Sequence, residues 1–284
     1  MIPWSMADSV WPCRVMCEGC GAPLDVLAWQ PHEGIVEGQA CSCGRVNHQS
    51  ALGPRLGKRE FEAIARDAKW QAFENAWCGR DPWYWLVNYV VTVDEHWTEK
   101  GLTGPYNRFP ARPQLRSYMQ TLLAYPLTAW PKSRQQMLTW LVASSMLGMA
   151  MFVPATLALV QSKVGRDAVA VLKRISSVLE KIGRFAPWMM PALEGRSLGK
   201  DDGYIALANG STLRAAPQGA HNVQSHTPTW LFLDEVQQQD EAEEAFYQAL
   251  PAVQRITLVG SAEFCWFWSD LLPDRASRAK GRVA

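Results

Sequence analysis

The second half of the chain alternates short apolar runs with segments of helical periodicity, and this alternation most constrains the fold. The runs PLTAW, TLALVQS, TWLFLD and RITLVG are typical of strands, and LTWLVASSMLGMA, GRDAVAVLKRISSVLEKIG and DEAEEAFYQAL are typical of helices. A hairpin is expected in YIALANGSTLRAA, where Asn209-Gly210 suits the turn. Strands that alternate with helices predict an α/β fold, with a mainly parallel sheet and helices on both faces.

One uncharged stretch, residues 137–160, is long enough to span a membrane. Ser144, Ser145 and Gly148 interrupt it, and Pro154 breaks it near its end. We therefore expect a buried helix that leads into a buried strand, and no membrane partner. The formal net charge of +1 excludes a global basic field, so any contact with nucleic acid must use local patches.

The amino-terminal region carries two close pairs of cysteines, in the patterns Cys-x-x-Cys and Cys-x-Cys, and Gly follows each pair. This spacing suits a closed tetrahedral thiolate site, which predicts a structural zinc ion. Reduced cysteines in a loop are the alternative, and His32 or His48 could replace a ligand. No signal peptide is visible, so a reducing cytosol is expected. The predicted ligands are Cys17, Cys20, Cys41 and Cys43.

The string TWLFLDEVQQQ places Asp234 and Glu235 directly after an apolar run. In a P-loop ATPase a buried strand ends in an Asp that serves Mg²⁺ and a Glu that polarises water. The same string also suits a strand that enters the acidic amino terminus of a helix. The residues alone leave both interpretations open.

A second candidate segment, PKSRQQMLT, lies between the run PLTAW and the next helix. A loop between strand and helix directs backbone N–H groups at an anion, to which a Lys adds charge and a Thr hydroxyl can add a Mg²⁺ ligand. The segment is not the common GxxxxGK[ST] motif, because it has no Gly and no Lys before Thr139.

The segment KSRQQMLT resembles the deviant Walker A loop of bacteriophage large terminases, K-x-R-Q-x-G-x-[ST]. It matches at Lys132, Arg134, Gln135 and Thr139 and departs at Met137, where the family has Gly. DPWYWLVNYVVTVDEH, FPARPQLRSY, the approach to LFLDEV, and LVGSAEFCWF look like further family segments in the same order. The resemblance covers roughly residues 80–272 and implies a P-loop NTPase fold.

The resemblance also implies roles for individual residues, with ATP and Mg²⁺ as cofactors. Arg134 would stabilise transition-state charge, Glu235 would orient the attacking water, and Ser261 would couple the nucleotide state to DNA. Gln114 would contact adenine. The remaining residues that the resemblance assigns to nucleotide and Mg²⁺ binding are Lys132, Ser133, Gln135, Thr139 and Asp234.

The expected function is an ATP-driven DNA-packaging motor domain in the host cytoplasm. Its partners would be double-stranded DNA, a viral portal and a small terminase subunit, and it would form a homo-oligomeric ring. The alternative is a non-catalytic module in which a zinc ribbon sits on a degenerate P-loop scaffold, and Met137 favours it. No segment resembles the family's nuclease domain, so no nuclease activity is expected.

Four segments are predicted along the chain. A zinc-ribbon-like segment is followed by a helical and extended lead-in region, which begins with one amphipathic helix over residues 55–77. The ATPase core and a basic tail follow. Their predicted bounds are 1–53, 54–113, 114–272 and 273–284.

Overall fold

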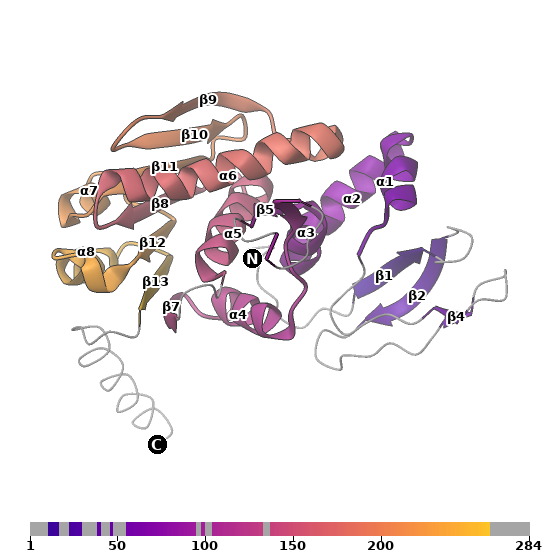
Figure 1. Ribbon diagram of the computed structural model, residues 1–284, viewed down its shortest axis with the longest axis horizontal. Coiled ribbons are helices and arrows are strands. Elements are labelled where there is room, and N and C mark those ends of the chain that lie inside the picture. The colour runs from indigo at the N-terminus through magenta and orange to yellow at the C-terminus, as the bar shows by residue number, and fades with distance from the viewer. Residues whose placement is uncertain are drawn as a thin grey trace, which may run out of the picture. The chain divides into compact units, whose positions relative to one another are not determined.

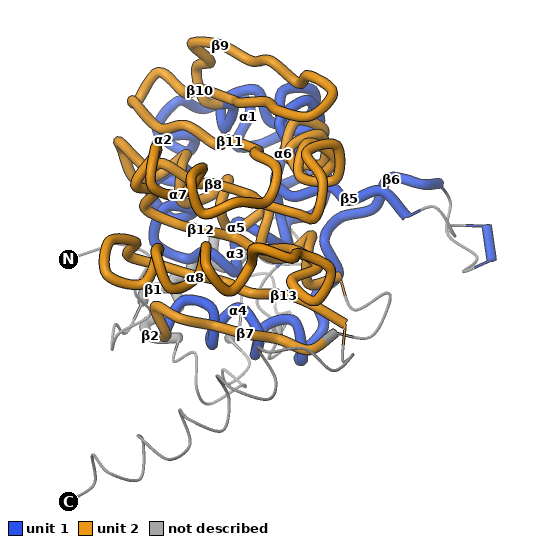
Figure 2. The backbone as a smooth tube through the Cα atoms, turned by 90° about the vertical axis from the view of Figure 1, so that its left-hand side faces the viewer, with its two compact units in different colours: residues 1–124, 178–190 blue, residues 125–177, 191–284 orange. Residues whose placement is uncertain are grey.

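The computed structural model describes residues 11–16, 23–29, 39–40, 46–47, 55–94, 98–99, 104–132 and 137–261. The chain forms two compact units, coloured separately in Figure 2. The first unit comprises residues 1–124 and 178–190, and the second comprises residues 125–177 and 191–284.

The second unit is built on a seven-stranded sheet in the order β7-β13-β12-β8-β11-β10-β9. The five strands from β7 to β11 pair in parallel, whereas β10 and β9 pair antiparallel at one side. This confirms the predicted α/β class with a mainly parallel sheet. The strands are β7 (Leu127–Lys132), β8 (Leu157–Ser162), β9 (Leu193–Leu198), β10 (Gly203–Leu207), β11 (Thr212–Pro217), β12 (Trp230–Asp234) and β13 (Arg255–Ser261).

Helices cover both faces of this sheet, as Figures 1 and 2 show. Leu231 and Leu233 of β12 pack in one apolar cluster with residues of α7 (Ala220–Gln224) and α8 (Ala242–Ala249). Successive side chains of a strand point to opposite faces, so Trp230 and Phe232 face the other way, toward the side that α5 (Leu138–Phe152) covers. All four side chains are fully buried.

The sequence predicted the hairpin of this sheet but not its edge strand β9. β10 and β11 form the predicted hairpin, and Gly210 adopts a positive φ of 82° in its turn. The edge strand β9 was not predicted. Its sequence LEGRSL is mostly exposed, so it lacks the apolar run that marks the central strands.

The uncharged stretch becomes α5 followed by β8. Most of α5 is buried. The helix ends at Phe152, and Val153, the residue before Pro154, has an extended backbone. Among the described residues, no helix has both the length and the apolar character needed to cross a bilayer.

The first unit is mainly helical. The single helix expected over residues 55–77 was wrong, because the chain forms α1 (Lys58–Ala65) and α2 (Ala68–Arg80) instead. Asp67 separates them: its extended backbone ends one helix, and its carboxylate caps the next by accepting from Lys69 N at 2.8 Å. The other described elements of this unit are β1 (Trp11–Met16), β2 (Pro23–Trp29), β3 (Gln39–Ala40), β4 (Val46–Asn47), α3 (Pro82–Tyr89), β5 (Val91–Val93), β6 (Tyr106–Arg108), α4 (Pro113–Ala124), the end of α6 (Gly165–Phe185) and η1 (Pro187–Met189).

A buried carboxylate lies in the core of this first unit. Glu74 is 6% exposed, and its Oε1 accepts hydrogen bonds from the hydroxyls of Tyr84 at 2.7 Å and Tyr89 at 2.8 Å. Burial, followed by the charge of Glu74 and other neighbours, raises the pKa of Tyr84 well above its ordinary value, so this hydroxyl stays a donor. Trp83 and Trp85 are also buried.

Candidate nucleotide site

The carboxyl ends of three adjacent strands bring the sequence candidates of the second unit to one edge of the sheet. β13 lies between β7 and β12, and its last residue, Ser261, pairs in register with Lys132 at the end of β7. Asp234 ends β12 and pairs with Val259. Ligands of open α/β sheets bind at this edge, so the backbone alone places Lys132, Ser261 and Asp234 where an anionic ligand is expected.

Thr139 and Asp234 form the best-defined contact of this edge. The Thr139 hydroxyl, in the first turn of α5, lies 3.2 Å from each carboxylate oxygen of Asp234. The two residues are 9% and 6% exposed. A buried hydroxyl beside a carboxylate offers the hard oxygen atoms that Mg²⁺ prefers, so the donor set fits this ion.

The junction between the loop and α5 has a left-handed backbone. Met137 has φ 57° and ψ 15° and precedes the first residue of the helix, and its carbonyl accepts from Leu141 N at 2.9 Å. Residues with a Cβ pay for this conformation, whereas Gly adopts it freely. The position at which the sequence departs from the terminase pattern is therefore one where the backbone favours Gly.

Glu235 stands at a second left-handed position, with φ 55° and ψ 44°. It is half-buried, and it leads into the short 3-10 helix η2 (Val236–Gln238). Val236 is fully buried in the apolar cluster under α7 and α8, and Gln239 Nε2 donates to the Asp234 carbonyl at 2.8 Å. These contacts fix the turn that carries Glu235 to the edge of the sheet.

The structure thus gathers Lys132, Thr139, Asp234, Glu235 and Ser261 at one edge of the second unit. It describes only the backbone of Lys132. Gln114 is exposed on α4 in the first unit. The other loop candidates, Ser133, Arg134 and Gln135, lie outside the described residues, as do the predicted zinc ligands Cys17, Cys20, Cys41 and Cys43.

Within the described part of the chain, no three His, Cys, Asp or Glu side chains gather as a metal site. The predicted zinc ribbon therefore stays a prediction, since its four cysteines lie outside that part.

One buried polar residue near this edge was not predicted. Gln161, on β8, is fully buried, and its Nε2 donates to the carbonyls of Pro217 at 3.2 Å and Gly219 at 3.0 Å. It thereby fixes the segment that follows β11. A single Gln at the end of the apolar run TLALVQS was the available signal, because a buried amide needs hydrogen-bond partners.

Two histidines lie shortly before β12, His221 on α7 and His226 in the turn that follows it. His221 Nδ1 lies 3.0 Å from the Ser225 hydroxyl. Partial burial, then the charges of Arg214 and His221, lower the pKa of His226.

Comparison with known proteins gives matches at the level of structure only. No family model and no curated protein matches the chain. Among solved structures, the HK97 bacteriophage large terminase is 15% identical with a TM-score of 0.47, over 69% of this chain and 40% of that chain. The large terminase ATPase domain of a Thermus phage is 15% identical with a TM-score of 0.39, over 63% and 73%.

A large terminase from a thermophilic bacteriophage, solved in complex with ADP, is 14% identical with a TM-score of 0.34, over 53% of this chain and 37% of that one. The chain therefore spans about two fifths of the whole large terminases that it matches.

Proposed function

We propose that the chain binds Mg-ATP at the carboxyl edge of its parallel sheet and hydrolyses it, as the motor domain of a bacteriophage large terminase. The contact between Thr139 and Asp234 carries this proposal. It joins the helix after the loop KSRQQMLT to the strand before Glu235, two segments far apart in sequence that the motifs assign to one nucleotide site.

The proposed roles follow from position and chemistry. Thr139 and Asp234 would hold Mg²⁺, which when bound neutralises charge on the phosphates. Lys132 and the backbone of the adjoining loop would hold the phosphate oxygens, with Ser133 and Gln135 beside them. Glu235 would accept a hydrogen bond from the attacking water and orient it.

Three further roles are proposed from the resemblance alone. Arg134 would stabilise the charge that develops on the transferred phosphoryl group, and Ser261 would couple the nucleotide state to DNA. Gln114 would contact the adenine ring. Each of these residues has a side chain suited to its role, since a guanidinium, a hydroxyl and an amide all bond to phosphate or base atoms.

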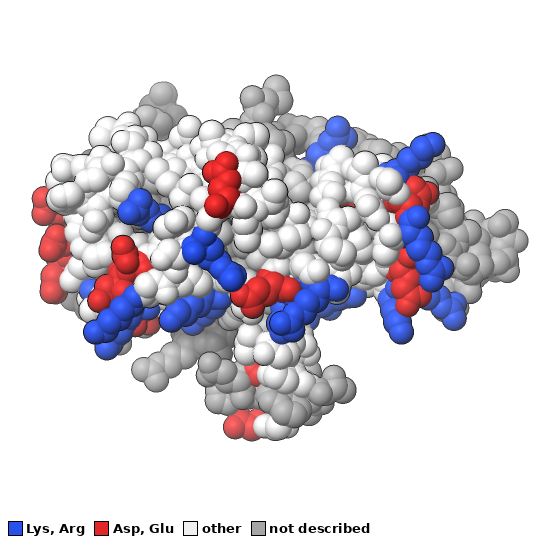
Figure 3. Space-filling view, turned by 90° about the horizontal axis from the view of Figure 1, so that it is seen from above, with Lys and Arg blue, Asp and Glu red and all other residues white. Residues whose placement is uncertain are grey.

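The proposed work is the translocation of double-stranded DNA, with a portal and a small terminase subunit as partners and a homo-oligomeric ring as the active form. On the face shown in Figure 3, Lys and Arg side chains are interspersed with Asp and Glu, in line with the net charge of +1. Any contact with the DNA backbone would therefore use local groups of Lys and Arg, and it would weaken as salt concentration rises.

Glu235→Gln is the variant that tests catalysis. We expect wild type to turn over Mg-ATP, with or without double-stranded DNA, and Glu235→Gln to lose at least about 100-fold in kcat while still binding nucleotide. The control is Glu243→Gln, which changes an exposed carboxylate in the first turn of α8. Equal rates in wild type and Glu235→Gln would refute the assigned role.

The second candidate function is a non-catalytic module that binds DNA or a protein partner, and the left-handed Met137 favours it. A wild-type protein that neither binds nor hydrolyses ATP would support this candidate. The structural zinc is common to both, and metal analysis of the purified protein tests it. We expect about one equivalent, and less than half would contradict four cysteine ligands.

A further inference from the structure

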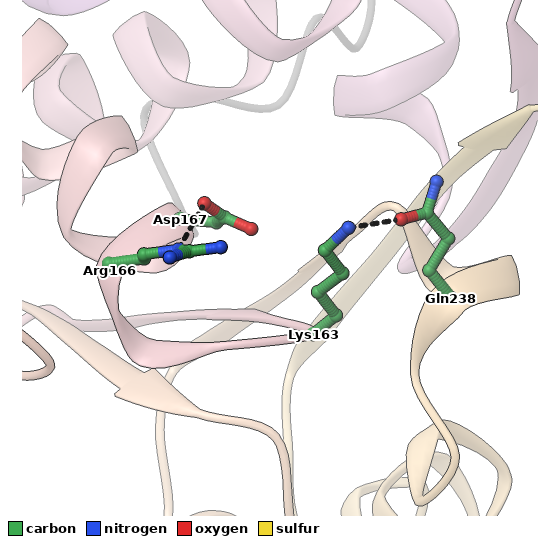
Figure 4. Close-up of polar contacts among 4 residues, drawn as sticks. All are labelled: Lys163, Arg166, Asp167 and Gln238. Atoms are coloured by element: carbon green, nitrogen blue, oxygen red, sulfur yellow. Dashed lines mark hydrogen bonds and ion pairs between the residues drawn. The ribbon is translucent and has the colours of Figure 1, made fainter.

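The turn that carries Glu235 is followed by three consecutive glutamines, Gln237, Gln238 and Gln239, each of which bonds to a different segment. Gln239 bonds back to the Asp234 carbonyl, as described above. Gln238 Oε1 accepts from Lys163 Nζ at 2.7 Å on the exposed side of this edge (Figure 4). Gln237 Oε1 accepts from Ser261 N at 3.0 Å, at the end of β13.

The contact between Gln237 and Ser261 is closely packed. A Cβ placed on Gly260 would lie 2.6 Å from Gln237 Oε1 and 2.8 Å from Val236 Cγ1, which is closer than real Cβ atoms approach other heavy atoms. The amide is therefore seated against the β13 backbone where only Gly leaves room for it. Val236 is fully buried, so the base of the turn cannot retreat without disturbing the core.

The orientation of this amide follows from its partner. Ser261 N–H is a donor, so Gln237 must present its oxygen there and direct Nε2 elsewhere. That Nε2 is buried and has no hydrogen-bond partner within the described residues. The Gln237 Nε2 group is therefore a buried donor that could bond to an acceptor atom of a ligand or of a water molecule.

The bond also connects two parts of the candidate site. Gln237 is two residues after Glu235, and Ser261 pairs in register with Lys132 across β13 and β7. Movement at the phosphate-binding end of β7 would displace Ser261, and the Gln237 amide would pass that displacement to the turn of Glu235.

We propose that Gln237 is a positioning residue that couples Glu235 to Ser261, so that the water-orienting carboxylate responds to the state of the bound nucleotide. This inference rests on the proposed ATPase function. The residue holds the geometry of the reaction through its bond to the Ser261 backbone.

Gln237→Met removes the acceptor at nearly constant volume, and Gln238→Met is the matched control, since it removes the neighbouring, exposed bond to Lys163. We expect Gln237→Met to lower kcat about tenfold, as the loss of one well-placed hydrogen bond implies, with KM and Tm nearly unchanged. Gln238→Met should retain the wild-type kcat. Gly260→Ala should act in the same direction as Gln237→Met, because its Cβ meets the same amide.

Hydrogen exchange at the Ser261 amide supplies a readout that does not need turnover. We expect faster exchange in Gln237→Met than in Gln238→Met, and protection by Mg-ATP in the control variant only. Equal kcat in the two variants, or a kcat loss matched by an equal loss of nucleotide affinity, would overturn the coupling. If wild type has no turnover, the proposed function fails, and equal exchange in the two variants would then refute the link separately.

Discussion

Replacement of Met137 tests whether the left-handed turn before α5 exists in solution. Met137 adopts φ 57° and ψ 15°, a conformation that costs a residue with a Cβ roughly 1–2 kcal/mol. Gly avoids this cost but loses about 0.5–1 kcal/mol through the greater freedom of the unfolded chain. The two terms together predict that Gly at this position is more stable than Ala by up to about 1.5 kcal/mol.

The comparison of Met137→Gly with Met137→Ala isolates the Cβ, because both variants lose the same partly buried side chain. The assay is the free energy of unfolding in urea, followed by a probe of the second unit, with Tm as a second measure. A difference of 1 kcal/mol corresponds to a shift of about 2–4 °C in Tm for a domain of roughly 150–250 residues. Turnover should persist in the Gly variant, since its backbone keeps the same conformation.

Two further substitutions serve as controls of opposite sign. Ala155→Gly changes an exposed left-handed residue with φ 56° and should also stabilise the protein. Ala170→Gly changes an exposed position within α6 and should destabilise it by about 1 kcal/mol. If Met137→Gly were less stable than Met137→Ala while both controls behaved as expected, the left-handed turn would be refuted.

Three other predictions concern the site and the core. Thr139→Ala should weaken Mg-dependent nucleotide binding about tenfold, measured by titration calorimetry, because it removes the hydroxyl that lies beside Asp234. Thr139→Ser keeps this hydroxyl and should bind nucleotide as wild type does. Equal weakening in both variants would contradict a role for the hydroxyl. Tyr89→Phe should lower the free energy of unfolding by about 1–2 kcal/mol, because it removes a buried donor to Glu74, and a change below about 0.5 kcal/mol would contradict this. Burial, followed by the charges of Glu74 and Asp81, raises the pKa of the Cys78 thiol. Peptide mapping after alkylation at neutral pH should therefore find Cys78 labelled only in the unfolded protein. Labelling of the folded protein at the rate of a free thiol would refute the burial of Cys78.

The central strands could be predicted from the sequence because burial on both faces demands apolar residues throughout. β12 shows this most clearly, since all five of its residues are buried. The edge strand β9 is mostly exposed, so its residues need not be apolar. Only its pairing with β10 identifies it as a strand. The break between α1 and α2 escaped prediction because apolar spacing continues across it, while the cap at Asp67 depends on one local hydrogen bond.

The candidate site divides in the same way. Asp234 and Glu235 could be assigned to a strand end because the apolar run before them is unmistakable. The contact with Thr139 depends on where α5 begins relative to β12, which only the folded chain reveals. The partners of Gln237 and Gln238 were equally inaccessible, because three identical residues in succession carry no information about which strand each one meets.

Backbone strain alone does not identify the functional edge. Among the described residues other than Gly, those with positive φ are Met137, Ala155, Thr227 and Glu235. Ala155 and Thr227 precede β8 and β12, at the amino edge of the sheet, where no candidate residue lies. Left-handed residues therefore occur at both edges of the sheet. The carboxyl edge differs because its left-handed residues adjoin the buried contact between Thr139 and Asp234. Met137 lies two residues before Thr139, and Glu235 directly follows Asp234. This pairing of strained backbone with buried oxygen atoms supports the proposed nucleotide site, because backbone strain persists only where the surrounding contacts require it.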